Sequence, residues 1–153
     1  WQGKSGKKMF LENLLNRGAV PVLEQVMNFT QQRHSVLVNN ISNFDTPGYK
    51  MQDLPVAEFD AALQEAVARR EQKGGAGPLE MRPSRHLQWD RAGALQAEAA
   101  ELADNNILFH DDNNRFVEKQ MSEMAKNTLR HNVTVEMLRA QYNGLETAIR
   151  GKL

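Results

Sequence analysis

No cysteine occurs among the 153 residues, so the chain can form neither a disulfide framework nor a thiolate metal site. An excess of one charge is also absent, because 19 Lys and Arg residues balance 19 Asp and Glu residues. This balance gives no electrostatic reason to expect nucleic acid or an anionic membrane as a partner. No apolar run approaches the roughly 18 residues that a membrane-spanning helix needs. We therefore expect neither nucleic-acid binding nor direct membrane insertion.

A cleaved signal peptide is not expected at the start of the sequence. The segment from Lys7 is basic and then partly apolar, but Glu12, Asn13 and Asn16 interrupt the apolar core that a signal peptide requires. No small-residue cleavage site follows. Residues 1–8 are interpreted as an extension before the natural first residue, Met9.

The residue types that carry catalysis or bind metals are not arranged for either task. The four histidines show neither the i, i+4 spacing of a zinc pair nor a His-Glu-x-x-His motif. The polar connector 104–114 does not match a calcium loop, because Leu108 or Phe116 would occupy a ligand position. Its Asp and Asn residues are interpreted as helix caps. The sequence therefore predicts no enzyme, no metal and no cofactor.

Two helices are expected near the start of the chain. Residues 10–17 can form a short helix that Gly18 ends, and Pro21 is favourable in the first turn of the next helix. The main helix is predicted from Pro21 to Asn43, because its apolar residues recur at three- and four-residue spacings. A helix of this length is roughly 35 Å long and requires a partner for its apolar stripe. Its candidate contact residues are Leu23, Val26, Leu37 and Ile41.

The strongest periodic pattern lies at the other end of the chain, from Arg115 to Ile149. Ten positions there alternate four and three residues apart, which predicts a coiled-coil seam. Leu129, Val133 and Met137 form a second apolar edge, so we expect the helix to contact more than one neighbour. The seam positions are Val117, Met121, Met124, Thr128, His131, Val135, Leu138, Tyr142, Leu145 and Ile149, of which all but Thr128 and His131 are candidate subunit contacts.

The middle of the chain is expected to be irregular, with short helices. A helix is predicted to begin after Asp53 and to end near Lys73, where the Gly-rich run 74–78 breaks it. Residues 78–89 are predicted to be extended or irregular, because Pro83 opposes a helix. The Ala and Glu content of residues 92–103 predicts a further, weakly amphipathic helix.

A dense turn signal follows the first long helix. Pro47 fixes its own φ and disfavours the α region for Thr46, so the helix is expected to end before Thr46. Gly48 directly after Pro47 fits a type II turn, whose third position requires a positive φ. We therefore predict a sharp turn at Pro47 and Gly48.

The residues around this turn resemble the signature of the bacterial flagellar rod, hook and hook-filament-junction proteins. The matching residues are Asn40, Asn43, Thr46, Pro47, Gly48, Tyr49 and Lys50. Residues 112–121, Met124-Ala125 and Asn127-x-Leu129-Arg130 look like the C-terminal helix entry of the proximal rod proteins of the basal body, most like the FlgB type. Phe59-x-x-x-Leu63 and Pro83-x-x-His86-Leu87 also match that family, and the similarity extends from about Phe10 to Leu153.

The resemblance implies a structural subunit of the rod, the axial drive shaft that transmits torque and surrounds the export channel. It implies contacts with further copies of the chain, with other rod proteins, and with inner-membrane ring and rod-adaptor proteins. It also implies export through the flagellar type III export apparatus without a cleaved signal peptide. The expected location is the periplasmic rod of the flagellar basal body.

We therefore expect a mainly α fold in which long N- and C-terminal helices pair as a coiled-coil-like bundle. Residues 9–50 would form the N-terminal helical part of a rod core domain, 51–111 a variable middle segment, and 112–153 the C-terminal helix of the core. A helical secretion chaperone or adaptor that binds a client through the same apolar faces is the alternative. It predicts a stoichiometric complex and no polymer.

Overall fold

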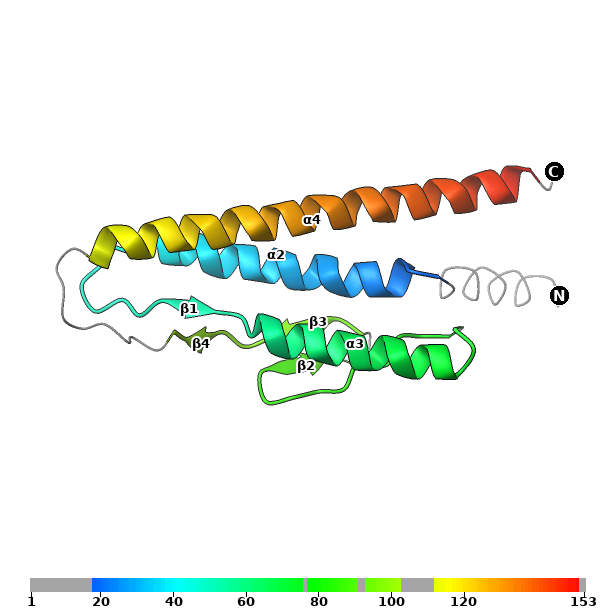
Figure 1. Cartoon of the computed structure of the whole chain (residues 1–153), viewed down its shortest axis with the longest axis horizontal. Coiled ribbons are helices and arrows are strands. Elements are labelled where there is room, and N and C mark those ends of the chain that lie inside the picture. Colours follow the sequence, from blue (N-terminus) through cyan, green and yellow to red (C-terminus); the bar gives the residue numbers. More distant parts are fainter. Residues whose placement is uncertain (1–17, 76, 91–92, 103–111, 152–153) are drawn as a thin grey trace.

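The computed structural model describes residues 18–75, 77–90, 93–102 and 112–151, and within them the chain is mainly helical. The helices are α2 (Val20–Ser42), α3 (Val56–Gln72) and α4 (Asp112–Arg150). The long helices α2 and α4 lie side by side and run in opposite directions (Figure 1). This arrangement confirms the prediction of a mainly α fold with paired terminal helices. The short helix expected at residues 10–17 and the connector 104–111 lie outside the described residues.

The bounds of α2 and α3 follow the local signals in the sequence. Pro21 lies in the first turn of α2, where its missing N–H costs no hydrogen bond, and α2 ends one residue before the predicted end at Asn43. The chain leaves α3 through Gly74 and Gly75, whose φ angles are +88° and +72°. Such left-handed glycines are the usual ends of helices. Proline and glycine therefore determine both elements, as predicted.

In the part of the chain that the structure describes, four short strands form two antiparallel pairs beside α2. Strand β1 (Gln52–Asp53) pairs with β4 (Ala100–Glu101), and β2 (Leu87–Trp89) pairs with β3 (Leu95–Ala97). The turn between β2 and β3 is closed by the backbone N–H of Gly93, which donates to the carbonyl of Asp90 at 3.0 Å. Gly93 has a φ of +83°, a value that favours glycine.

The helix predicted for residues 92–103 is wrong, since the described residues there form β3 and β4. Leu95, Ala97 and Ala99 point inward or are half-buried, whereas Gln96 and Glu98 between them are exposed. This is the two-residue period of a strand. Helix propensity is a weak determinant even for residues such as Ala and Glu, and the pairing of β3 with β2 and of β4 with β1 outweighs it.

The apolar core lies between α2, α3 and the β2–β3 hairpin. Phe29 of α2 and Phe59 of α3 stack with ring centroids 4.1 Å apart and are almost fully buried. Their neighbours in the core are Val26, Leu54, Leu87 and Leu95. Because this core occupies the side of α2 that faces α3 and the strands, α2 lies between α4 and the remainder of the fold (Figure 1).

Two glutamines of α2 attach the hairpin to that helix. The side-chain amide of Gln32 donates to the carbonyl of Leu95 at 2.7 Å and accepts from the N–H of Ala97 at 3.1 Å. Gln25 accepts from the indole N–H of Trp89 at 2.9 Å and donates to the carbonyl of Gly93 at 3.1 Å. The free edge of β3 is therefore paired with side chains rather than with another strand. Among the described residues, no helix is both long and apolar enough to cross a membrane.

Candidate functional site: the α2–α4 pair and its turn

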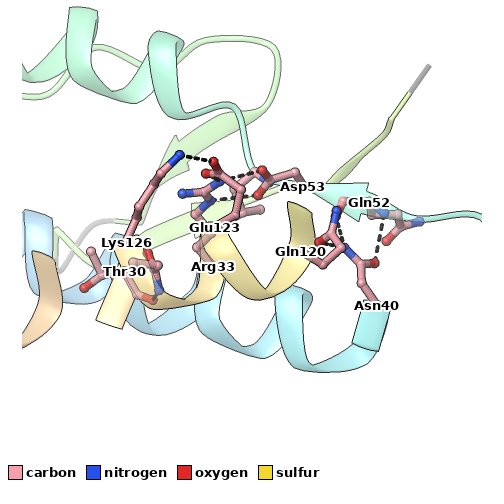
Figure 2. Close-up of polar contacts among 10 residues, drawn as sticks. Thr30, Arg33, Asn40, Gln52, Asp53, Gln120, Glu123 and Lys126 are labelled. Carbon is pink, nitrogen blue, oxygen red and sulfur yellow. Dashed lines mark hydrogen bonds and ion pairs between the residues drawn. The ribbon is translucent and has the colours of Figure 1, made fainter. Parts of the chain in front are cut away.

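Asn40 is the most fully enclosed polar residue of the turn motif, with 0% of its surface exposed. Its amide nitrogen donates to the carbonyl of Gln52 at 2.6 Å and to Oε1 of Gln120 at 3.0 Å. Its oxygen accepts from the N–H of Gln52 at 3.0 Å and from the hydroxyl of Tyr49 at 3.1 Å. Figure 2 shows Asn40 between Gln52 and Gln120. One side chain therefore ties together α2, the turn, β1 and α4.

The predicted turn is confirmed in its geometry. The N–H of Tyr49 donates to the carbonyl of Thr46 at 3.1 Å, and Gly48 has a φ of +77°. With Pro47 before Gly48, this is the arrangement of a type II turn. Asn43 caps the end of α2, because its side-chain amide donates to the carbonyl of Asn39 at 2.9 Å. The turn directs Tyr49 back toward α2, so that the end of the motif is hydrogen-bonded to Asn40 at its beginning.

Lys50, the last residue of the motif, forms an ion pair across the β1–β4 sheet. Its Nζ lies 2.8 Å from Oε2 of Glu101, and both side chains are mostly exposed. An exposed pair of this kind contributes little to stability. The motif is therefore stabilised mainly by the hydrogen bonds of Asn40 and Tyr49 and by the turn at Gly48.

Arg33 forms the second polar connection between α2, β1 and α4, and it is 7% exposed. Its guanidinium donates to both carboxylate oxygens of Asp53 at 2.8 and 2.7 Å and to Oε2 of Glu123 at 2.9 Å. Lys126 donates to the other oxygen of Glu123 at 2.8 Å. Figure 2 shows these four charged side chains gathered where the three elements meet.

Hydrogen bonding in this cluster shifts two pKa values. The hydrogen bonds from Lys126 and then from Arg33 lower the pKa of Glu123 below its usual value. The hydrogen bond to Asp53 raises the pKa of Arg33 above its usual value, although burial opposes that shift. Both shifts favour the charged forms, as expected when opposite charges share hydrogen bonds.

Thr30 forms a third polar connection, nearer the middle of the helix pair. Its hydroxyl donates to the carbonyl of Met27 at 2.9 Å and lies 2.9 Å from Nδ1 of His131. Asn127 donates to the carbonyl of Thr30 at 2.8 Å. Thr30, Asn127 and His131 are among the residues that line an open groove of about 340 Å³ between the helices.

The face of α4 toward α2 is consequently more polar than the predicted seam. Gln120, Asn127 and Thr134 are buried at intervals of seven residues. Leu138 is also buried, while Val117, Met124, His131, Val135 and Leu145 are half-buried. The predicted seam includes these six residues, but its other four positions, Met121, Thr128, Tyr142 and Ile149, are exposed.

Polar groups on α2 explain why the buried face of α4 differs from the predicted seam. The buried carbonyl of Thr30 and the side chains of Arg33 and Asn40 require hydrogen-bond partners, since an unsatisfied buried polar group is costly. Asn127, Glu123 and Gln120 supply those partners. The sequence-based prediction assigned no contact to these three residues or to Arg33 and Asp53, although Gln120 and Asn127 lie in the stretches that resemble the family. The seven-residue recurrence of Gln120, Asn127 and Thr134 was the signal that could have indicated the face.

Of the four predicted contact residues of α2, two are buried in the protein and two are half-buried. Leu37 is fully buried, and Val26 belongs to the core with Phe29 and Phe59. Leu23 and Ile41 are half-buried. These positions contribute to the fold itself, and their role in contacts between subunits stays a prediction.

An apolar edge of α4 remains uncovered within the described structure. Leu129 is 66% exposed, and Val133 and Met137 follow it at four-residue intervals on the same face. Met121 is 55% exposed. Exposed apolar groups at regular helical spacing typically mark surfaces that contact another protein.

The described residues contain no group of three or more His, Asp or Glu side chains placed to hold a metal ion. Glu58 and His86 form a separate contact on the surface of α3, with Oε2 and Nδ1 3.2 Å apart. The pKa of Glu58 is lowered, chiefly by its hydrogen bond with Ser84 and then by His86. Both of its partners come from the segment before β2, so the contact joins that segment to α3.

Comparisons with known proteins show which protein family this chain is similar to. The family described as flagella basal body rod protein matches residues 24–50, which span most of α2 and the whole turn. The flagellar basal body rod protein FlgB of Cereibacter sphaeroides is 30% identical over 137 residues, covering 89% of this chain and 97% of that protein.

Two further relatives carry the same name. The FlgB protein of Aquifex aeolicus is 27% identical over 133 residues, covering 87% of this chain and 94% of the relative. The FlgB protein of Salmonella typhimurium is 26% identical over 132 residues, covering 84% and 90%. The similarity therefore includes both long helices and the segment between them, and the chain belongs to the FlgB-type family of flagellar basal body rod proteins.

Proposed function

We propose that this chain builds the rod of the flagellar basal body by packing the outer surface of its α2–α4 pair against neighbouring subunits. The observation that carries the proposal is the contrast between the two sides of α4. The side toward α2 is held by specific polar pairs, whereas Leu129, Val133 and Met137 on another face are exposed. Such a helix keeps its position within the chain and offers an apolar surface for assembly.

Torque would pass through this pair as a mechanical load between subunits. The contacts of Asn40 and Arg33 each join three elements, so they oppose sliding of α4 along α2. Buried polar groups are known to fix the register of paired helices. The turn at Gly48 would fix the direction in which the middle segment leaves the pair.

The neighbours in this proposal are further copies of the chain, other rod proteins and the inner-membrane ring and rod-adaptor proteins. The subunits would surround the export channel and reach their place through the flagellar type III export apparatus. The role is structural, and no catalytic step is part of it.

The test is a charge placed on the exposed edge of α4. The double substitution Leu129→Glu and Val133→Glu should leave the isolated chain folded but abolish rod assembly and swimming, because two charges cannot be buried in an apolar contact. Asn132→Glu, at an exposed polar position on another side of the same helix, is the control and should swim normally. Assembly is measured by isolating basal bodies from a strain that expresses each variant as its sole copy.

A motile strain with normal rods and the double substitution would show that this edge is not the contact surface. The chaperone or adaptor alternative predicts another result. In that case the chain would be recovered in a stoichiometric soluble complex with a client and would be absent from purified basal bodies.

A further inference from the structure

Two histidines that are far apart in the sequence line the same groove between α2 and α4. His34 belongs to α2 and His131 to α4, and the open groove that they share has a volume of about 340 Å³. The i, i+4 spacing of a zinc pair concerns two histidines of one helix. It therefore does not apply to a pair that two helices contribute, and only the packing of α2 against α4 brings these two side chains together.

Thr30 shows how close the two histidine side chains lie. Its Oγ is 2.9 Å from Nδ1 of His131. His34 follows Thr30 by four residues on α2, and side chains at this spacing lie on one face of a helix with Cβ atoms about 5–6 Å apart. An ion shared by two imidazoles requires a ring nitrogen of each at about 2.0–2.1 Å. Since both rings start beside Thr30, they can reach a common point in the groove.

The two rings differ in how firmly they are held. Nδ1 of the half-buried His131 is engaged with Thr30, so Nε2 is the nitrogen of that ring left for a further ligand. Metal-binding histidines typically bind the ion with one nitrogen while a hydrogen bond at the other orients the ring. His34 is exposed, so its ring can turn into the groove on a fast timescale. One ligand is therefore oriented in advance, and the other can close over an ion that enters from solvent.

The remaining lining of the groove decides which class of ion it suits. Gln31, Asn127 and Thr128 are polar, and no carboxylate occurs among the described residues that line the groove. Ca²⁺ and Mg²⁺ prefer carboxylate and carbonyl oxygens, whereas neutral imidazole suits Zn²⁺, Cu²⁺ and Ni²⁺. A water molecule occupies about 30 Å³ of liquid, so a groove of about 340 Å³ has room for an ion and the waters that complete its coordination.

We propose that His34 and His131 together bind one divalent transition-metal ion of the class of Zn²⁺, Cu²⁺ and Ni²⁺, and so link α2 to α4 near the middle of the helix pair. The inference goes beyond the proposed role in the rod, because it assigns a ligand to the single chain. An ion that binds the paired helices and not the unfolded chain stabilises the folded state by mass action. The stability of the helix pair therefore rises with the concentration of the metal.

Zn²⁺ is the probe for the test, because it has no redox chemistry and no preference for one geometry. The full chain is titrated with zinc chloride in a calorimeter at pH 7.5, where free imidazole is mostly neutral. Its unfolding temperature is then measured at several zinc concentrations. His34→Gln and His131→Gln each remove one proposed ligand and keep a polar side chain. His86→Gln is the matched control, because His86 contacts Glu58 of α3 and does not line the groove.

We expect His34→Gln and His131→Gln each to weaken zinc binding about tenfold or more, since losing a residue that only orients a metal ligand already costs about 10–100-fold. Zinc should raise the unfolding temperature of the parent chain and of His86→Gln, and should raise that of the other two variants much less.

Circular dichroism without metal verifies that each variant is folded. Unchanged affinity in either His34→Gln or His131→Gln, or an equal loss in His86→Gln, would overturn the proposal. If His131→Gln does not fold, His34→Gln decides the outcome, because that position is exposed. The measurement uses the free chain, so its outcome does not depend on whether the protein assembles into a rod.

Discussion

The side chain of Asn40 pairs with the peptide group of Gln52 as a neighbouring strand would, donating to its carbonyl and accepting from its N–H. Gln32 does the same on β3, between Leu95 and Ala97. Side chains of α2 thus cover the edges of strands only two and three residues long. Such short strands have little stability of their own, so α2 holds the middle segment in place.

Replacing Asn40 should be among the costliest changes at the turn. We expect Asn40→Ala to lower the free energy of unfolding by about 2–3 kcal/mol, because buried groups of Gln52 and Gln120 lose their partners. Urea unfolding followed by circular dichroism measures the change. Asn39→Ala, at an exposed neighbouring position, is the control and should change stability by less than about 0.5 kcal/mol. Equal effects of the two substitutions would contradict the central role of Asn40.

We expect substitution of glycine by alanine to lower stability at Gly48 and to raise it at Gly144, because the two backbone conformations differ. Nothing lies within 4 Å of a Cβ added at Gly48 or at Gly144, so neither change meets a steric clash. Gly48 has a φ of +77°, and Gly48→Ala should therefore cost about 1–2 kcal/mol.

Gly144 lies inside α4, where Gly144→Ala should stabilise the chain by about 0.5–1 kcal/mol. Thermal unfolding of the two variants and the parent chain measures both values. A neutral Gly48→Ala variant would show that the turn does not need a positive φ. Gly48→Val should in addition disrupt rod assembly, since the turn directs the chain away from the helix pair.

Glu123 predicts a dependence of stability on pH. Its pKa in the folded chain is lowered, mainly by Lys126 and then by Arg33. A lowered pKa contributes stability that is fully present above the unfolded value of about 4.3 and is lost as the pH falls through the folded value.

We therefore expect the difference in stability between the parent chain and Glu123→Gln to be largest near pH 7 and to shrink below about pH 4. Urea midpoints measured from pH 7 to pH 3 test this expectation. Glu118→Gln, at an exposed position of the same helix, is the control. A constant difference across the whole range would exclude an ionised Glu123 as the source.

The stack of Phe59 on Phe29 predicts the largest effect of a single core substitution. Both rings are buried, and the guanidinium of Arg130 lies 5.9 Å from the centre of the Phe59 ring. Phe59→Ala should cost about 3–5 kcal/mol, since it removes a buried aromatic ring and leaves a cavity. Phe44→Ala, where the ring is 36% exposed, should cost less than about 1 kcal/mol. Guanidinium unfolding measures the loss of stability in each variant. Similar losses for Phe59→Ala and Phe44→Ala would contradict a central position of Phe59 in the core.

The sequence by itself determined the features that rest on neighbouring residues. Apolar spacing together with proline and glycine predicted α2 to within one residue at each end and α3 to within a few residues, and the pair Pro47-Gly48 predicted the turn. These features depend on φ preferences and helical periodicity, which act over a few residues. The motif around the turn also indicated the family.

Tertiary structure alone decided the strands and the face of α4 that meets α2. Leu95 to Ala97 form a strand because residues 87–89 of the same hairpin and the distant Gln32 supply hydrogen-bond partners, and the propensities of Ala and Glu do not encode those partners. Likewise, Gln120 and Asn127 are buried, and Met121 is exposed, because Asn40 and Thr30 lie on the other helix. A buried polar side chain is stable only where its partner is present, and the partner's position is fixed when the whole chain folds.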